Sequence, residues 1–448
     1  MKCALLLAAF GFVACASEAM PVKQPNVILI VVDTLRMDHT NLDGYERETT
    51  PFLAELVAEG AYSLQNVRAS APWTKPSVAS ILTGLDPREH GVLGHPDRLH
   101  SSNKTLAEIY HDAGYQTAAF QSNLLLSSVF GYDQGFDSYN EEFLAGHRES
   151  TGAGLNAAVA KWLDEERDPD RPFFLYIHHF EPHFDYLRSG EEWVADYDGP
   201  LTGAETMDQL IGATDKLRTA ELRFLASRYD AEIQYQDQLL HELWGEFGQR
   251  GLQDDVLLAV TADHGEEFGE HGDISHQYKM YDELLHVPLV IRTGAGAARG
   301  LDPSACELGV SLKQLGATLL DLSGVKADFA GPSMAGVFVE FPVLSHSMLH
   351  DGSKEMRNVD MVFNGREKLI RIEGTSGQAE QLLYFDTVDD PQEKLDLSQA
   401  SPERVRSLLN LLESTLARRA KEGPLDLKTE SILLDEGTLQ RMRDLGYF

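Results

Sequence analysis

Two acidic residues directly follow two apolar segments that are predicted to be buried strands. Asp33 follows the run 27–32, and Asp263, with His264 beside it, follows the run 256–261. In an open parallel sheet, catalytic groups gather just beyond the carboxyl ends of the strands, so these side chains are expected to converge. Two carboxylates and an imidazole suit a divalent cation such as Ca²⁺, Mg²⁺, Mn²⁺ or Zn²⁺. A lone acid at a strand end is more often a helix cap, so this prediction depends on the convergence.

A hydroxyl nucleophile is predicted at Thr74. Pro76 suits the first turn of a helix that runs to Leu82 and ends at Gly84, which places Thr74 just before a helix N-terminus. Free backbone N–H groups and the helix dipole favour an anion at that point. A hydroxyl that lies there and also binds a divalent cation loses its proton more easily and becomes a nucleophile. The competing interpretation is that Thr74 only caps the helix.

The elements that must position these residues alternate between strand and helix patterns. The later patterns cover, in chain order, 51–60, 105–113, 116–120, 173–177 and 222–247. The runs 116–120 and 173–177 are of the buried-strand type, and the others are helical. This alternation predicts an α/β domain over residues 23–330, with a large, mostly parallel sheet sandwiched by helices.

The pattern changes in the last quarter of the chain. The β-rich runs 359–363 and 368–372 flank Asn364-Gly365, which is a strong hairpin signal. A helix is predicted over residues 402–419. Residues 331–448 are therefore predicted to form a smaller antiparallel subdomain closed by a C-terminal helix.

The first 22 residues are interpreted as an export signal and linker. The apolar run over residues 4–13 is too short to span a bilayer, and it ends in small residues as cleavage sites do. The tetrapeptide 12–15 resembles a lipobox, in which Cys15 becomes the lipid-modified first residue; an ordinary signal peptide is the alternative. The protein is thus predicted to be periplasmic or at the cell surface, with membrane attachment through Cys15. Cys306 has no disulfide partner and is interpreted as structural.

The charge of the chain limits its partners. The formal net charge is -33 over 448 residues. Such a surface repels polyanions at long range, so nucleic acid is not expected as a partner. A core of ample size is available at this length, and the charge says nothing about the fold.

Taken together, these segments resemble the sulfatases and the wider alkaline phosphatase superfamily. The matching motifs, in chain order, are 33–39, Thr74-x-Pro76-Ser77, Leu82-Thr83-Gly84 with His90-Gly91, 114–118, 173–176 with Pro182-His183, Asp263-His264-Gly265, 281–283 with 287–289, and 434–447. The resemblance extends over most of the mature chain. It implies an alkaline phosphatase-like fold and hydrolysis of sulfate or phosphate esters, with a small-molecule, glycan or lipid ester as substrate.

The resemblance also implies roles for individual residues. One divalent cation would be bound by Asp33, Thr74, Asp263 and His264. His183 and His276 would contact the substrate anion or the leaving group, and either imidazole could act as general acid near neutral pH. His178 and His179 are not assigned to the site, because one of them is expected to face the core.

Several positions depart from the sulfatase pattern. Proven sulfatases carry a cysteine, oxidised to formylglycine, in a CxPxR motif. The residues at that motif here are Thr74, Pro76 and Val78, the two usual lysines are matched by Ser122 (beside Asn123) and Gln277, and the second acid of the usual Asp-Asp pair is matched by Thr34. The changes at Val78, Ser122 and Gln277 remove positive charge that would hold a sulfate monoester, and the loss of the cysteine favours phosphate mono- or diesters. Lys75 is predicted to supply part of the missing charge; the alternative is an exposed lysine at the helix start.

Three hypotheses on function follow. The leading one is a hydrolase that acts through a covalent threonine ester with one metal ion, as is typical of nucleotide phosphodiesterases of this superfamily. The second is a transferase of the same superfamily, although such enzymes usually carry several transmembrane helices. The third is a catalytically inactive, anion-binding surface lipoprotein, whose expected mark is a lost metal ligand. All four candidate ligands are present here.

Overall fold

The computed structural model describes residues 24–444 apart from 145–150, 189, 191–192, 194–195, 277, 350–355, 423–429 and 434–435. The export signal with Cys15, Gln277 and part of the C-terminal motif lie outside the described residues, so export and lipid attachment stay predictions. Among the helices that are described, none combines the length and the apolar character that a membrane crossing requires.

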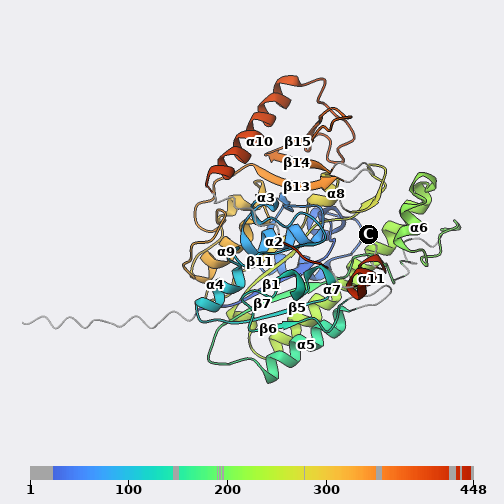
Figure 1. Ribbon diagram of the computed structural model, residues 1–448. Helices are drawn as coiled ribbons and strands as arrows, with labels where there is room; N and C mark the ends of the chain where they lie inside the picture. Colours follow the sequence, from blue (N-terminus) through green and yellow to red (C-terminus); the bar gives the residue numbers. More distant parts are fainter. Residues whose placement is uncertain are drawn as a thin grey trace, which may run out of the picture.

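A seven-stranded sheet forms the centre of the molecule, in the order β2-β11-β8-β1-β7-β5-β6 (Figure 1). Its strands are β1 (Asn26–Val32), β2 (Tyr62–Leu64), β5 (Gln116–Gln121), β6 (Ser138–Asn140), β7 (Phe173–His179), β8 (Val256–Ala262) and β11 (Leu289–Arg292). All pairs are parallel except those of β11, which runs antiparallel to β8 and β2. Every residue of β1, β7 and β8 is buried, which explains their continuous apolar runs. The predicted mostly parallel sheet is confirmed, with strand ends that differ by one or two residues.

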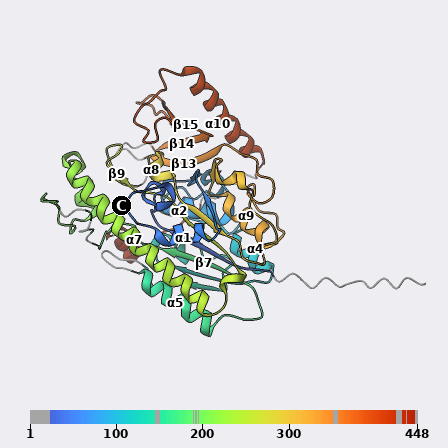
Figure 2. The same ribbon diagram turned by 180° about the vertical axis from the view of Figure 1, so that it is seen from behind.

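Helices cover both faces of this sheet. The main ones are α1 (Pro51–Ala58), α2 (Thr74–Thr83), α4 (Leu106–Asp112), α5 (Gly152–Glu165), α7 (Thr219–Gln249) and α9 (Gln314–Ser323). Figure 1 shows α2, α4 and α9 in front of the sheet, and Figure 2 shows α1, α5 and α7 on the opposite side. The shorter elements are α3 (Pro87–His90), α6 (Met207–Ile211), α8 (Asp282–Leu285), β3 (Val67–Arg68), β4 (Asp97–Arg98), β9 (Glu267–Phe268), β10 (Ile274–Ser275) and β12 (Val310–Ser311). Cys306 is a free thiol at the end of a short 3-10 helix, Pro303–Cys306.

A smaller antiparallel sheet follows, as predicted. Its strands β13 (Val343–Leu349), β14 (Arg357–Asn364), β15 (Glu367–Ile372) and β16 (Gln381–Asp386) pair in sequence order. Helix α10 (Pro402–Glu422) closes this sheet through apolar side chains such as Leu408 and Leu412. The chain then returns to the larger α/β domain, where β17 (Glu430–Ser431) pairs with β4 in a separate two-stranded sheet. Helix α11 (Glu436–Asp444) ends the described part. The exact domain boundaries stay predictions.

Candidate active site

Two neighbouring strand ends and one helix start meet at a single buried point. Asp33 follows β1, and Asp263 and His264 follow β8, the strand beside it. The His264 Nε2 atom lies 3.6 Å from Asp33 Oδ1 and 3.5 Å from Asp263 Oδ2. Thr74 Oγ1 lies 3.3 Å from the same nitrogen. The structure thus brings together the four residues that were predicted to bind a cation.

The donor atoms of this cluster fit a divalent cation. Asp33 Oδ1 and Asp263 Oδ2 are buried, and neither has a hydrogen-bond partner among the described residues. A buried oxygen without a partner is costly, so a shared cation would satisfy both. Ligands that sit about 2.0–2.2 Å from a tetrahedral cation are separated by about 3.3–3.6 Å. The separations around His264 Nε2 fall in that range.

The imidazole of His264 is in the form that binds a cation. Burial, and then the charge of Asp33, raise the pKa of Asp263 well above its usual value. Burial acts to raise the pKa of Asp33 as well, but a hydrogen bond from His178 and the nearby imidazoles outweigh it and lower that pKa. Burial, followed by the charge of His276, lowers the pKa of His264. His264 is therefore neutral, and because its Nδ1–H donates to the Gly265 carbonyl over 2.9 Å, Nε2 presents a lone pair to the cluster.

Thr74 is the first residue of α2, whereas the sequence placed it just before the helix. The N-cap residue is Trp73, and its side chain makes no capping hydrogen bond. The Thr74 hydroxyl contacts His264 Nε2 and lies 3.5 Å from Asn123 Nδ2. The hydroxyl therefore faces the cluster, which the capping interpretation did not anticipate.

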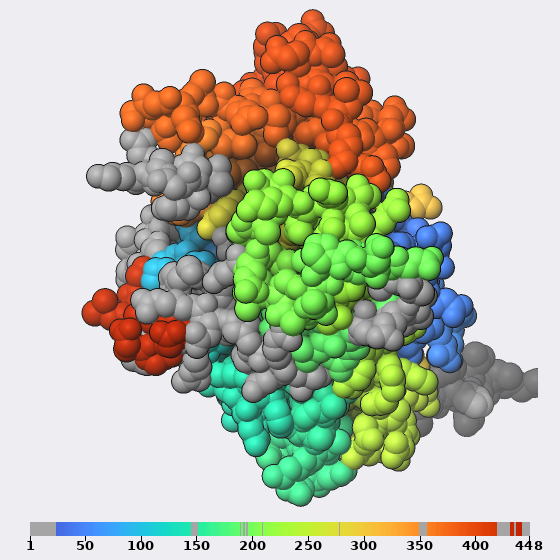
Figure 3. All heavy atoms as spheres, turned by 90° about the vertical axis from the view of Figure 1, so that its right-hand side faces the viewer, coloured from blue at the N-terminus to red at the C-terminus, as the bar shows by residue number. Residues whose placement is uncertain are grey.

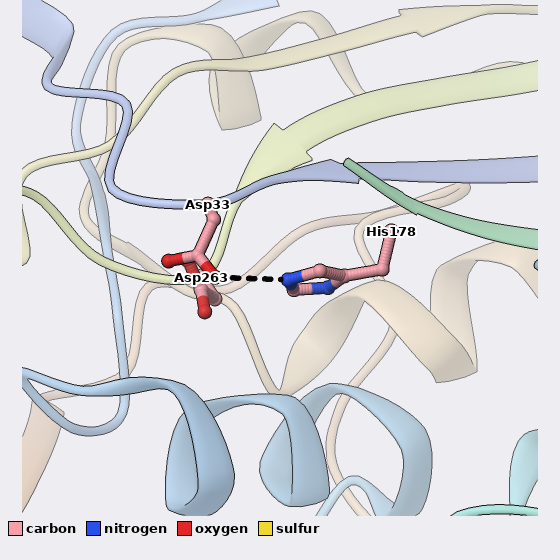
Figure 4. Close-up of side chains that lie close together, drawn as sticks. All are labelled: Asp33, His178 and Asp263. Carbon is pink, nitrogen blue, oxygen red and sulfur yellow. Dashed lines mark hydrogen bonds and ion pairs between the residues drawn. The ribbon is translucent and has the colours of Figure 1, made fainter. Parts of the chain in front are cut away.

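The cluster also contains His178, which the sequence left outside the site, and Asn123, to which it gave no role. Asn123 donates its amide to Asp33 Oδ2 over 2.6 Å, and His178 Nε2 lies 3.3 Å from the same oxygen (Figure 4). His178, Asp33 and Asp263 offer ligand atoms that all lie within 4.8 Å of one another. Because His178 and Asn123 share Oδ2, they orient Asp33 so that its unpartnered Oδ1 faces His264. The signal for His178 was its place at the end of a buried strand next to β1.

The predicted substrate histidines border the cluster. The ring of His276 lies 4.3 Å from that of His264 and 5.1 Å from that of His183, measured between centroids. Burial lowers the pKa of His183. For His276 burial acts in the same direction, but Glu266 outweighs it and raises the pKa. Of the two imidazoles, His276 therefore has the higher pKa, which makes it the better candidate for the proton donor.

A comparison with known families agrees with this geometry. The model of the family described as Sulfatase matches residues 25–325. The chain belongs to the sulfatase family. It is accordingly a hydrolase that acts on sulfate or phosphate esters, as predicted. This family generally binds a divalent metal ion, for which the cluster around Asp33 and Asp263 is the candidate site.

Two curated relatives of this sulfatase-family chain align over most of its length. An N-acetylglucosamine-6-O-sulfatase of Bacteroides thetaiotaomicron is 24% identical over 420 residues and covers 74% of each chain. An arylsulfatase of Clostridium perfringens is 22% identical, over 90% of this chain and 96% of the relative. Among solved structures, the phosphonate monoester hydrolase of Agrobacterium radiobacter is similar with a TM-score of 0.64 and 18% identity, over 89% of this chain and 96% of that chain. The structural likeness confirms the alkaline phosphatase-like fold.

Glu266 is a further site residue that the sequence analysis missed in this member of the sulfatase family. Its side chain is fully buried. Oε1 accepts a hydrogen bond from His276 Nδ1 over 3.0 Å, and Oε2 accepts one from the Tyr186 hydroxyl over 3.3 Å. The signal for it was its position directly after the motif Asp263-His264-Gly265.

Lys75 lies differently from both interpretations of the sequence. Its side chain is fully buried, so it is not an exposed lysine at the helix start. The ammonium donates to the carbonyl oxygens of His95 and Asp97 and lies 3.5 Å from the centroid of the Phe130 ring. Burial lowers the pKa of Lys75. These contacts tie Lys75 to a neighbouring loop, and we correct the expectation that its charge serves the substrate directly.

Proposed function

We propose that this sulfatase-family protein hydrolyses singly charged phosphate or phosphonate esters through a Thr74 nucleophile assisted by one divalent cation. The observation that carries the proposal is the placement of Thr74 Oγ1, 3.3 Å from His264 Nε2 and beside the unpartnered oxygens of Asp33 and Asp263. Asp33, Thr74, Asp263 and His264 would hold the cation.

The side chains supply the following mechanism. A divalent cation, when bound, lowers the pKa of the Thr74 hydroxyl and offsets negative charge that develops on the substrate. The Thr74 hydroxyl gives its proton to solvent and its oxygen attacks phosphorus, while the bond from phosphorus to the leaving oxygen breaks. His276 Nε2 gives that leaving oxygen a proton and regains one from solvent before the next turnover. Water then attacks the phosphorus of the threonine ester, which releases Thr74 and the product acid. The N-terminus of α2 favours the developing anion at Thr74.

The charge of the site argues for a monoanionic substrate. The charged groups that act on Asp33 and Asp263 are carboxylates and imidazoles. The ammonium of Lys75 is bound by backbone carbonyls. With two carboxylates and one divalent cation the site is close to neutral, so a dianionic phosphate monoester is held less well than a diester or a phosphonate monoester. The missing CxPxR cysteine argues in addition against sulfate esters.

A substrate panel tests this proposal. For wild-type protein we expect kcat/KM for bis(4-nitrophenyl) phosphate and for a 4-nitrophenyl phosphonate monoester to exceed that for 4-nitrophenyl phosphate by about 10-fold or more, because one negative charge fewer enters the site. Turnover of 4-nitrophenyl sulfate should be slowest. The rates are measured by nitrophenol release with each divalent cation in turn. Faster turnover of the sulfate than of the diester would overturn the substrate preference but not the role of Thr74.

A second prediction concerns proton donation by His276. Glu266→Gln keeps the shape of the residue that holds His276 Nδ1 but removes its charge, so protonated His276 becomes less favourable. We expect kcat/KM to fall by about 10²-fold for a diester with an alkyl leaving group, and by less than about 10-fold for 4-nitrophenolate, which leaves without a proton.

The neighbouring Glu267 offers a matched control for that comparison. It is also buried, and its carboxylate binds the Lys279 ammonium over 3.0 Å. Glu267→Gln should lower both rates to the same extent, if at all. Equal losses for the two leaving groups in Glu266→Gln would show that His276 is not the proton donor.

A further inference from the structure

One loop beside Thr74 carries a histidine that the mechanism does not use. His95 lies in the loop 93–98, and its ring is 4.8 Å from that of Trp73, the residue before the nucleophile. The residue is half-buried, and its Nδ1 atom is buried. It is also close enough to His276 for the charge of that residue to lower its pKa. His95 therefore borders the site on the side of the α2 N-terminus.

This loop is fixed from the inside by two charged side chains. The buried Lys75 ammonium donates to the carbonyl oxygens of His95 and Asp97, over 2.6 and 2.5 Å. Asp97 Oδ2 accepts hydrogen bonds from the backbone N–H groups of Leu93 and Gly94, over 3.0 and 2.7 Å. Burying an ammonium is costly unless it is well bound. The hydrogen bonds that bind the Lys75 ammonium also fix the backbone around His95.

The same loop is held from the outside by the C-terminal segment. Beyond α10 the C-terminal segment lies against the catalytic domain (Figure 1), where its red atoms lie beside the cyan atoms around residue 100 (Figure 3). Strand β17 pairs with β4, the Ile432 N–H donates to the Pro96 carbonyl over 2.9 Å, and the Ser431 hydroxyl donates to Asp97 Oδ1 over 2.8 Å. Both contacts fall on the residues directly after His95.

We propose that His95 is a substrate-contacting residue that forms a hydrogen bond with a hydroxyl of the alcohol-derived part of the ester, and that Lys75 and β17 position it. This inference rests on the proposed function. Burial, then Lys75 and His276, lower the pKa of His95 to about 4, so its imidazole is neutral at working pH. A neutral imidazole offers one donor and one acceptor, which suits a hydroxyl group better than a second anion.

Two diesters that differ only in their hydroxyl groups test the role of His95. They are 4-nitrophenyl glyceryl phosphate and 4-nitrophenyl propyl phosphate, which share a three-carbon substituent. We expect His95→Ala to raise KM for the glyceryl ester by about 10-fold, as loss of a neutral hydrogen bond does, with little change in kcat. The propyl ester should be unaffected. An equal change for both esters, or no change for either, would overturn the proposal.

Proline substitutions test the part that β17 plays. Ile432→Pro removes the N–H that donates to the Pro96 carbonyl. Leu433→Pro introduces proline at the next position, where the side chain is exposed. Ile432→Pro should reproduce the glyceryl-specific rise in KM, and Leu433→Pro should not. If Ile432→Pro lowers the melting temperature but leaves the ratio of the two KM values at the wild-type level, β17 has a structural role only.

A binding measurement separates this inference from the proposed function. Thr74→Ala protein loaded with metal should bind the glyceryl ester about 10-fold more tightly than the propyl ester by calorimetry, and the His95→Ala change made in that protein should abolish the difference. If wild-type protein shows no turnover, or turnover that Thr74→Ala protein retains, only the proposed function is contradicted. Equal binding of the two esters by Thr74→Ala protein would count against the role of His95.

Discussion

Replacing Thr74 with alanine is expected to lower kcat/KM for the preferred diester by at least about 10³-fold, because the attacking oxygen is removed. The protein should still fold, since the Thr74 side chain contributes no helix cap and its hydroxyl contacts only polar site residues. Asp33, Asp263 and His264 remain to hold a cation. Rates are measured at saturating metal, with circular dichroism and metal content recorded for each variant.

Two variants sharpen this experiment. Thr74→Ser keeps a hydroxyl at the same backbone position and should recover part of the activity. Thr83→Ala makes the same substitution at the other end of α2, where the hydroxyl donates to the Ala79 carbonyl, and it should leave kcat/KM near the wild-type value. Activity retained by Thr74→Ala would contradict the covalent mechanism, whatever the other two variants show.

The carboxylates of the site could be predicted because their strands are distinctive. β1 and β8 are buried on both faces, so each is a continuous apolar run, and the acid after each run must lie at the same edge of the sheet. The sequence alone therefore predicts that Asp33 lies beside Asp263. The same reasoning predicted the sheet, since strand and helix patterns alternate along the chain.

The partners of those carboxylates could not be predicted in the same way. His178 meets Asp33 because Val31 and His178 are opposite each other in the pairing of β1 with β7. That register depends on how two strands fit together, and neither strand encodes it alone. His178 also follows a run of apolar residues, so a core position was the natural expectation.

The direction of the Lys75 side chain and the position of the C-terminal segment could not be predicted either, for a related reason. Lys75 binds carbonyl oxygens of residues that lie 20 and 22 positions further along the chain, and backbone carbonyls leave no trace in a sequence pattern. β4 and β17 are two residues long each, which is too short for an alternating pattern. They are joined by contacts such as that between Ser431 and Asp97, 334 positions apart. Only the folded chain shows that this segment borders the site.

Loss of one carboxylate ligand is expected to abolish the stabilisation that a bound cation gives. A cation that binds only the folded protein, at about 100 times its Kd, adds about 2.7 kcal/mol, which raises the melting temperature of a chain of this length by about 3 °C. In Asp263→Asn protein this shift should vanish, because the cation loses a charged ligand. Metal content measured by mass spectrometry should fall from near one ion per chain to well below that.

Without metal, we expect the opposite order of melting temperatures for wild-type and Asp263→Asn protein. Burial and the charge of Asp33 raise the pKa of Asp263, so the metal-free fold binds a proton there more tightly than the unfolded chain and loses stability as the pH rises. A neutral asparagine removes that cost, and metal-free Asp263→Asn protein should melt at or above metal-free wild type near neutral pH. Asp237, a buried carboxyl that accepts from the backbone N–H groups of Phe52 and Leu53, is the control, and Asp237→Asn should keep the metal-dependent shift. A wild-type melting temperature that responds to no divalent cation would instead indicate an anion-binding protein without a metal centre.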